Sequence, residues 1–541
     1  MTQYLLACEA DKIQDFVFRS SRLREVVGGS QLLSRFCKDV PSLLRPSNTE
    51  MKVVINAGGS FRILFDDEEK AKEFSANLAE VYRRATGSSL TVAEPVEVID
   101  IDDFNKASEK AEDNLRKAKR WRAGWQSQEQ MPYMAFCSSC GMGLATTYTT
   151  YHIGEEKQYL CASCLNKSAE RKGHEHAEEL GPFLGAFYRE VVKEPDKLAL
   201  ACWPGKEERN GRSKKDPTED IADYDPRRYV AYLLADGNAM GEVFGKCKDP
   251  HKMQKLSNGL TQAMHHALAV PTKKIMGPSD DLFIPVLPLI LGGDDLFALI
   301  PAPWALDFAD QFCRVFEEEM DELINTQLGL NMPTPTISVA VVICKSKHPY
   351  KLAHEAGETK LKDAKRIGKR IKLAENKPYS TVHFEVVLGG RLVSEMPRKE
   401  IRPTLCPYLV IDNDESEWGL SIQRLIEQRW ELRGIPNKRL SELQRLYDLN
   451  KLPDYLDNDK ISPWKSKLGR LLKRINQRNE VQAEKIENAL KKLGESDPPY
   501  LREVSRYPDS AWYGHGLPDL LGAWDFAMNL DKDRKAYEME G

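Results

Sequence analysis

The chain lacks the features that mark membrane, secreted and strongly nucleic-acid-binding proteins. No run of about 18 apolar residues occurs in its 541 residues, so the sequence predicts no transmembrane span and no membrane partner. The first residues, MTQYLLACEADK, include neither a basic start nor a long apolar segment, which argues against a secretory signal peptide. The formal net charge is only −4, so any RNA contact would need local basic patches or partner subunits.

A pattern typical of a disulfide framework is also missing. Of the 11 cysteines, some stand in paired CxxC spacing and the others are scattered, which favours a reducing compartment and a cytoplasmic location. The paired ones are Cys137, Cys140, Cys161 and Cys164. Two such pairs match a four-cysteine site, in which each pair supplies two thiolates to a tetrahedral Zn²⁺ ion. Because four protein ligands leave no open position, we expect this zinc to be structural rather than catalytic.

The sequence has an acidic glycine turn between two apolar runs. Ile284 to Pro301 reads IPVLPLILGGDDLFALIP, and the tetrapeptide GGDD stands at residues 292–295. Two apolar runs joined in this way predict a buried β-hairpin, because glycine accepts the positive φ of a tight turn. The bare glycines also let a large ligand approach the backbone, and the two carboxylates suit a hard divalent cation. For the tetrapeptide by itself, a solvated hairpin turn is the alternative.

Another acid precedes this hairpin in the chain. Tyr229 to Met240 reads YVAYLLADGNAM, a short buried strand that ends at Asp236 before a helical pattern. Carboxylates from two adjacent strands can clamp Mg²⁺ (or Mn²⁺) ions, which stabilise the attacking and leaving oxygens in phosphoryl transfer. Downstream, Thr336 to Cys344 is another apolar strand, and in the lysine-rich helix that follows it we select Lys365 as the contact for a triphosphate.

This order of elements fits a ferredoxin-like palm of the polymerase and cyclase type. The acids that we expect to be catalytic and to hold magnesium are Asp236, Asp294 and Asp295. The residues that we expect to bind the nucleotide are Gly237, Asn238, Gly292, Gly293 and Lys365.

The N-terminal part repeats this pattern without its acids. YLLACEADKIQDFVF resembles VAYLLADGNAMGEVF, and VVINAGGSFRILF resembles PLILGGDDLFALI, with two glycines at the same place. In the first copy, Ser60 and Phe61 stand where the second copy has its two aspartates. Two like palms with one set of acids indicate that one copy is catalytic and that the other is a scaffold or binds nucleotide. Likeness by fold alone is the alternative.

The predicted fold class is α+β, with two ferredoxin-like palm domains, a four-cysteine zinc module and a C-terminal helical domain. A degenerate first palm covers residues 1–110, and a helical and zinc-binding module covers residues 111–204. Residues 205–228 are charged and poor in apolar side chains, which predicts a flexible loop. The GGDD palm covers residues 229–390, and the helical domain, in which apolar residues recur at three- and four-residue spacing, covers residues 391–541.

These motifs resemble those of a known family. The stretch IQDFVF…GGSQLLSRF, the cysteine module, the GGDD palm and the helical tail are together similar to the large, cyclase-like subunit of type III CRISPR effector complexes. The resemblance implies a palm that converts ATP into cyclic oligoadenylate messengers when the complex binds target RNA. It also implies CRISPR RNA, backbone subunits and small helical subunits as partners.

The chain departs from the family pattern at two places. Many members have Asp-Gly-Asp where this chain has Asp236-Gly237-Asn238, so Asp236 alone is carried over as a metal ligand. Many relatives begin with an HD nuclease domain, whereas this chain starts at a palm strand and contains no His-Asp dipeptide. We therefore expect no cleavage of single-stranded DNA.

The sequence leaves other functions open. One alternative is a catalytically silent, RNA-binding scaffold subunit whose palm binds ATP without turnover. Asn238 leaves this alternative open, because it stands where many family members have an aspartate. The same palm can also adenylate another small molecule to give, for example, an S-adenosylmethionine conjugate. A stand-alone cyclase resembling GGDEF-type diguanylate cyclases is a further reading, but such enzymes need neither a duplicated palm nor a zinc module and helical tail.

Overall fold

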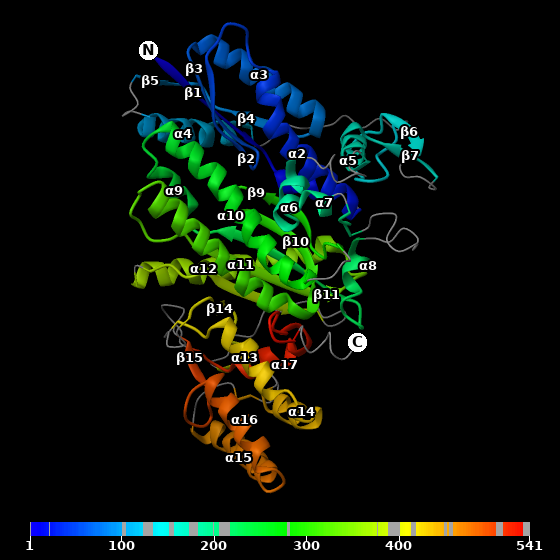
Figure 1. Ribbon diagram of the computed structural model, residues 1–541, viewed down its shortest axis with the longest axis vertical. Helices are drawn as coiled ribbons and strands as arrows, with labels where there is room; N and C mark the ends of the chain where they lie inside the picture. The colour runs from blue at the N-terminus through cyan, green and yellow to red at the C-terminus, as the bar shows by residue number, and fades with distance from the viewer. Residues whose placement is uncertain are drawn as a thin grey trace.

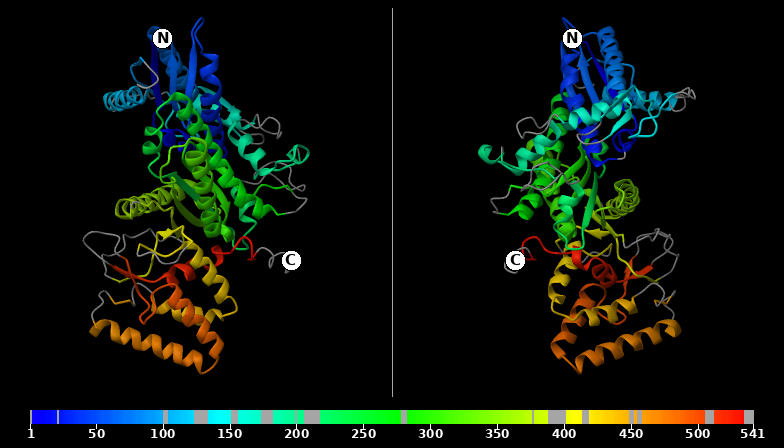
Figure 2. Two further views of the ribbon diagram at one scale, coloured as in Figure 1. Left: turned by 60° about the vertical axis from the view of Figure 1, so that its left-hand side comes forward. Right: turned by 90° about the vertical axis from the view of Figure 1, so that its right-hand side faces the viewer.

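The fold is α+β, and its parts follow one another along the long axis of the molecule (Figure 1). The computed structural model describes residues 2–20, 22–99, 104–122, 134–150, 156–172, 182–198, 200–204, 217–277, 282–375, 377–387, 401–412, 418–447, 452–453, 458–504 and 512–533. The first palm, in blue, lies at one end, the GGDD palm, in green, lies in the middle, and the C-terminal part, in yellow to red, lies at the other end (Figures 1 and 2).

The first palm is a ferredoxin-like sheet with the strand order β2-β3-β1-β4, and β5 also pairs with β1. Its elements are β1 (Gln3–Ala10), α1 (Ile13–Phe18), α2 (Leu23–Leu43), β2 (Met51–Ala57), β3 (Ser60–Phe65), α3 (Glu68–Thr86), β4 (Leu90–Val92), β5 (Val96–Val98) and α4 (Phe104–Arg122). Alternate residues of β1 enter two different cores: Leu6 and Cys8 pack with α2 and α3, whereas Leu5 and Ala7 belong to the core that includes α4. The sheet is therefore covered on both faces.

One boundary in this part differs from the sequence prediction. The expected domain limit at residue 110 lies inside α4, whose Phe104, Ala107 and Leu115 are buried in the core with the first palm. Helix α2 runs without a break through the GGS of residues 28–30. Helix α4 therefore belongs to the first palm rather than to a connecting module.

The cysteine module is small and lies beside the first palm (Figure 1). It contains β6 (Thr147–Thr150), β7 (Lys157–Leu160) and α5 (Ala162–Lys172). The next helices, α6 (Pro182–Val191) and α7 (Pro195–Leu198), lead on to the second palm. Leu184, Phe187 and Tyr188 of α6 are buried in the main core, so α6 packs between the palms rather than with the cysteines.

The second palm has the strand order β14-β12-β11-β8-β10-β9. Its elements are α8 (Pro217–Ala222), β8 (Tyr229–Gly237), α9 (Met240–Gly245), α10 (Pro250–Met276), β9 (Leu287–Gly292), β10 (Asp295–Pro301), the 3-10 turn Ala302–Trp304, α11 (Ala305–Asp321), the π-helical turn Glu322–Gln327, β11 (Ile337–Lys345), α12 (Tyr350–Glu375), β12 (Thr381–Val386) and β14 (Tyr408–Leu409). The central strands β8 and β11 are buried almost throughout, which explains their continuous apolar sequence.

The two palms share one strand topology, as both a duplication and likeness by fold alone would predict. Strands β9-β10-β8-β11 of the second palm have the same order as β2-β3-β1-β4 of the first. Each palm has its two glycines at the turn between corresponding strands, and the two turns touch. A Cβ on Gly58 would lie 3.7 Å from the carbonyl carbon of Gly292. The palms thus face each other through the parts of the sequence that are most alike.

The flexible loop expected at residues 205–228 is partly wrong. Residues 217–222 form helix α8, in which Pro217, Asp220 and Ile221 are buried. The charged character of this segment does not prevent folding, because its apolar side chains reach the main core. Residues 205–216 lie outside the described residues.

The C-terminal part is mostly helical, as expected, but it also contains a small sheet. Its helices are α13 (Ile422–Leu432), α14 (Asn437–Leu446), α15 (Asn458–Asn476), α16 (Glu480–Lys492), α17 (Gly516–Gly522) and the 3-10 turn Trp524–Phe526, and the sheet has the order β13 (Ile401–Arg402), β16 (Trp512–Gly514), β15 (Arg502–Val504). After α17 the chain returns to the second palm, where the Leu530 amide donates to Asp307 at 2.6 Å. No helix in the described part of the chain is both long and apolar enough to cross a bilayer.

Candidate active site

Asp236 and the GGDD hairpin lie side by side. Strand β10 pairs with β8 so that Asp295 is the direct cross-strand partner of Asp236. The Gly237 amide donates to the Asp294 carbonyl at 3.2 Å, which extends the pairing into the turn. Gly293 has φ +62, a conformation that favours glycine over residues with a side chain. The turn chemistry and the strand register therefore bring the acids, which are far apart in the chain, to one edge of the sheet.

The acids are electrostatically crowded. Partial removal from water and the neighbouring Asp236 raise the pKa of Asp294 to about 6. The same two causes, together with Asp294, raise the pKa of Asp295 to about 8. Helix α12 supplies a counter-charge, because the Lys365 ammonium forms an ion pair with Asp236. A set of oxygen donors that repel one another in this way fits a divalent cation, which would neutralise them.

Asp236, Asp294 and Asp295 do not come together as the one compact group that the sequence predicts. Among the described residues, the acids are not a cluster whose ligand atoms all lie within 4.8 Å of one another. The side chain of Asp294 packs against Gly237, where a Cβ would lie 2.9 Å from the Asp294 Cβ and 3.3 Å from its Oδ2. The two acids that face each other across the strands are therefore Asp236 and Asp295, whereas the side chain of Asp294 lies against Gly237.

The structure gives Asn238 a different position from the one expected of a nucleotide contact. Its Nδ2 donates to the Thr336 hydroxyl at 3.0 Å, and its Oδ1 accepts from the Ser338 hydroxyl at 2.9 Å. The Asn238 amide donates to the Thr336 carbonyl at 2.8 Å. The nitrogen and the oxygen of the Asn238 side-chain amide are thus both hydrogen-bonded, to Thr336 and to Ser338 of β11. These bonds explain an asparagine at this position even if it binds no ligand.

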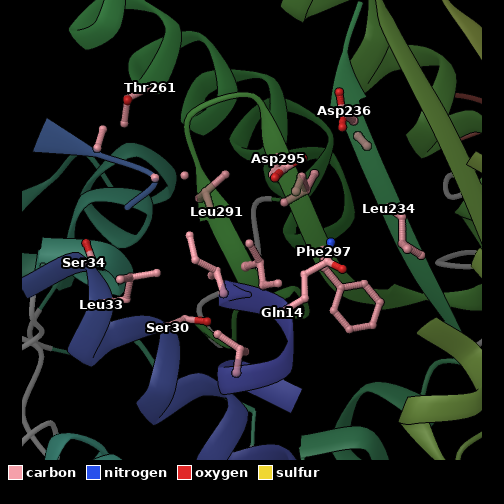
Figure 3. Close-up of a pocket in the computed structure, with 18 of the residues that line it drawn as sticks. Gln14, Ser30, Leu33, Ser34, Leu234, Asp236, Thr261, Leu291, Asp295 and Phe297 are labelled. Carbon is pink, nitrogen blue, oxygen red and sulfur yellow. The ribbon is translucent and has the colours of Figure 1, made fainter. Parts of the chain in front are cut away.

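A cavity of about 730 Å³ opens beside the acids, between the two palms. Of the expected site residues, Asp236, Asp295, Gly292 and Lys365 line it. Gly237, Asn238, Gly293 and Asp294 are not among its lining residues. Figure 3 shows Asp236 and Asp295 on neighbouring strands at one side of this cavity.

The opposite side of the cavity comes from residues to which the sequence analysis assigned no part in the site. Gln14 of α1 and Ser30 and Ser34 of α2 reach it from the first palm, and Thr261 reaches it from α10 (Figure 3). Gln14, Ser30 and Ser34 stand in the stretches IQDFVF and GGSQLLSRF that carry the family resemblance. Nothing in those stretches assigns them to the site, because polar residues on a helix are ordinarily solvated. The facing of the two palms brings Gln14, Ser30 and Ser34 toward the acids, whereas Thr261 belongs to the second palm itself.

The cysteines form a compact group. Ligand atoms of Cys137, Cys140, Cys161 and Cys164 all lie within 4.8 Å of one another. The Gly143 amide donates to the Cys140 sulfur at 3.4 Å, and a Cβ on Gly143 would lie 3.0 Å from the Cys161 sulfur. The donor set and the glycine that leaves room for it fit a tetrahedral ion bound by thiolates.

Fold and site together define the class of protein: a two-palm protein whose second palm is of the nucleotidyltransferase type. Residues 229–374 match the family model described as Cas10/Cmr2, second palm domain. Residues 229–374 therefore carry a palm domain of the Cas10/Cmr2 kind, which agrees with the resemblance that the motifs imply. No curated protein matches it in a sequence search.

Solved structures agree on the fold. Csm1 in T. onnurineus is similar with a TM-score of 0.50 at 15% identity, over 98% of this chain and 69% of that one. A Csm1-Csm4 cassette in complex with cA4 has a TM-score of 0.48 at 15% identity, over 86% of this chain and 64% of that one. The chain therefore spans 64% and 69% of the length of the two matched chains. At this identity the likeness concerns the fold.

Proposed function

We propose that the chain is a nucleotidyltransferase that joins ATP molecules into cyclic oligoadenylates, as the large subunit of a type III CRISPR RNA-guided effector complex. The observation that carries this proposal is the pairing of Asp236 with Asp295 at the edge of a cavity between the palms. Carboxylates on adjacent strands can hold the divalent cations that stabilise the attacking and leaving oxygens in phosphoryl transfer.

In this proposal, Asp236, Asp294 and Asp295 hold Mg²⁺ or Mn²⁺. The bound cation supplies charge that stabilises the developing negative charge on phosphate oxygens. The bare turn at Gly292 lets the triphosphate approach the backbone, and Lys365 moves from its ion pair with Asp236 to the phosphates. A ribose hydroxyl of one ATP then attacks the α-phosphate of another, and pyrophosphate leaves.

The partners belong to the same proposal. Relatives with this fold are described as Csm1-Csm4 assemblies, one of them in complex with AMPPNP and another with cA4. We propose that this chain likewise assembles with other type III subunits around CRISPR RNA, and that target RNA binding starts synthesis. We also propose that the four cysteines hold a structural Zn²⁺.

The test is synthesis from labelled ATP by the assembled complex, with and without target RNA, followed by mass spectrometry of the product. Asp294→Ala combined with Asp295→Ala is expected to abolish the product and to leave assembly intact. As a control, Glu68→Ala with Glu69→Ala removes two carboxylates from the surface of α3, where they pair only with the exposed Lys72 in the described structure, and should change neither. Unchanged product from the aspartate variant would refute the proposal.

The same experiment separates the alternatives. A scaffold subunit would bind the labelled ATP and release no pyrophosphate. A palm that adenylates S-adenosylmethionine would yield product only when that compound is added. A stand-alone cyclase would be active without RNA and without partner subunits.

A further inference from the structure

One buried lysine has no part in the chemistry proposed above. Lys167 lies on α5, three residues after Cys164, and is 1% exposed. Its ammonium donates to the Phe16 carbonyl, to the Val17 carbonyl at 3.4 Å and to the Ser20 hydroxyl at 3.2 Å. A lysine of the cysteine module is thus inserted into the first palm. A buried ammonium is costly unless it is hydrogen-bonded, so this placement needs a function.

Two of the three acceptors of Lys167, the carbonyls of Phe16 and Val17, lie in the last turn of α1 (Ile13–Phe18). A helix of six residues is marginal in isolation. Its N-cap, Lys12, is in the left-handed region and makes no side-chain capping bond. The carbonyls at its other end have no partners within the helix, and a cation placed there satisfies them and complements the helix dipole. Lys167 therefore supplies the cap that α1 itself lacks.

Helix α1 is also a wall of the nucleotide cavity. Ile13, Gln14 and Val17 line the cavity, and Gln14 lies on the side facing the acidic hairpin (Figure 3). Ile13 in addition packs under the first glycine turn, where a Cβ on Gly59 would lie 2.6 Å from its Cδ1. That turn touches the GGDD turn through Gly58. A shift of α1 would therefore move both the wall and the contact between the palms.

The position of Lys167 depends on the cysteine module as a whole. Ser139, between the first two cysteines, donates to the buried Glu25 of α2. Asn166 donates to the Ala85 carbonyl at the end of α3 at 2.8 Å. Gly29 of α2 makes room for the lysine, since a Cβ there would lie 3.3 Å from the Lys167 Cε. These contacts come from both halves of the four-cysteine site, which a bound metal holds together.

We propose that Lys167 is a positioning residue through which the metal-loaded cysteine module fixes α1, and so sets the affinity of the cavity for nucleotide. The proposal rests on the nucleotide site proposed above. It predicts that the cysteine module controls nucleotide affinity more than the rate of the chemical step, because α1 contributes a wall and none of the three acids.

Two variants of the full chain test this. Lys167→Met removes the cap of α1 while it keeps the length of the side chain. Asn166→Ala is the matched control, since it removes a hydrogen bond of the same helix that goes to α3 instead. Hydrogen exchange at the amides of residues 13–18 is expected to speed up in Lys167→Met and to stay unchanged in Asn166→Ala. Affinity for a non-hydrolysable ATP analogue should fall about tenfold in the lysine variant alone, as expected for loss of charge-assisted hydrogen bonds in a buried site.

A zinc chelator perturbs the same contact without a substitution. Added to the wild-type chain, it should accelerate exchange of residues 13–18 and weaken binding of the analogue. Unchanged exchange in both Lys167→Met and the chelated protein would overturn the proposal, and so would equal effects of Lys167→Met and Asn166→Ala. A wild-type chain that binds no analogue would overturn the nucleotide site, whereas the exchange comparison would still decide the coupling.

Discussion

Replacing Gly237 by alanine should displace Asp294 without removing any charge. A Cβ at position 237 would lie 2.9 Å from the Asp294 Cβ and 2.7 Å from the Met240 Cγ, closer than real side chains approach. The flexible side chain of Met240 can move away. Asp294 cannot, because it belongs to a tight turn and its own carbonyl accepts a hydrogen bond from the Gly237 amide at 3.2 Å. The substitution should therefore shift the carboxylate of Asp294 relative to Asp236.

The size of the effect follows from two general magnitudes. Overpacking of one methyl group costs about 1–3 kcal/mol of stability, which a protein of this length tolerates. A displacement of about 1 Å in a reacting group costs roughly 10²-fold in rate. We therefore expect Gly237→Ala to fold and assemble, to lose about two orders of magnitude in product formation from ATP, and to need more Mg²⁺ for half-maximal activity.

A matched control lies four residues further along. Gly241 has no atom within 4 Å of the position of an added Cβ, and it belongs to helix α9, where alanine is favoured over glycine. Gly241→Ala should keep full activity and should melt at the same or a slightly higher temperature. Product formation at the wild-type level in Gly237→Ala, with melting unchanged, would refute the idea that Asp294 must stay beside Asp236.

Two further predictions concern the charges around the site. Lys365→Met should raise the KM for ATP more than it lowers kcat, because the ammonium that pairs with Asp236 is proposed to bind the triphosphate. Steady-state kinetics of the assembled complex measures both constants. An unchanged KM would contradict the proposed role of Lys365. Since the folded-state pKa of Asp295 is raised to about 8 above an ordinary value of about 4, the folded chain binds protons that the unfolded chain has lost. Without divalent metal, the melting temperature should therefore fall as the pH rises from about 4 to about 8. The variant Asp295→Asn should show a smaller fall. If its melting temperature falls as much as that of the wild type, the acids do not crowd one another as described.

Much of the fold could be predicted because its signals are local. Two glycines between apolar runs require a hairpin whatever surrounds them, and CxxC pairs bring their thiols together within a few residues. The continuous apolar sequences of β8 and β11 indicate strands that are buried on both faces. The likeness of the two halves, read from the same patterns, is confirmed by their strand order.

Other features could not be predicted because they depend on which distant segments meet. The sequence of residues 217–228 is charged, yet α8 packs into the core because an apolar surface lies next to it. Asn238 looks like a substituted ligand, but its hydrogen bonds to Thr336 and Ser338 depend on the pairing of β8 with β11. The sequence around Lys167 is that of an ordinary surface lysine, and only the packing of the cysteine module on α2 buries this side chain.

By itself, the sequence determined the two palms, the acidic turn and the cysteine site, since each follows from backbone preferences and ligand spacing over short distances. Only the tertiary structure decided that the palms face each other, that their glycine turns touch, and that α1 forms one wall of the cavity beside Asp236 and Asp295. The reason is physical. The direction of a side chain and its neighbours are set by packing between elements far apart in the chain, and no periodicity or spacing encodes that packing.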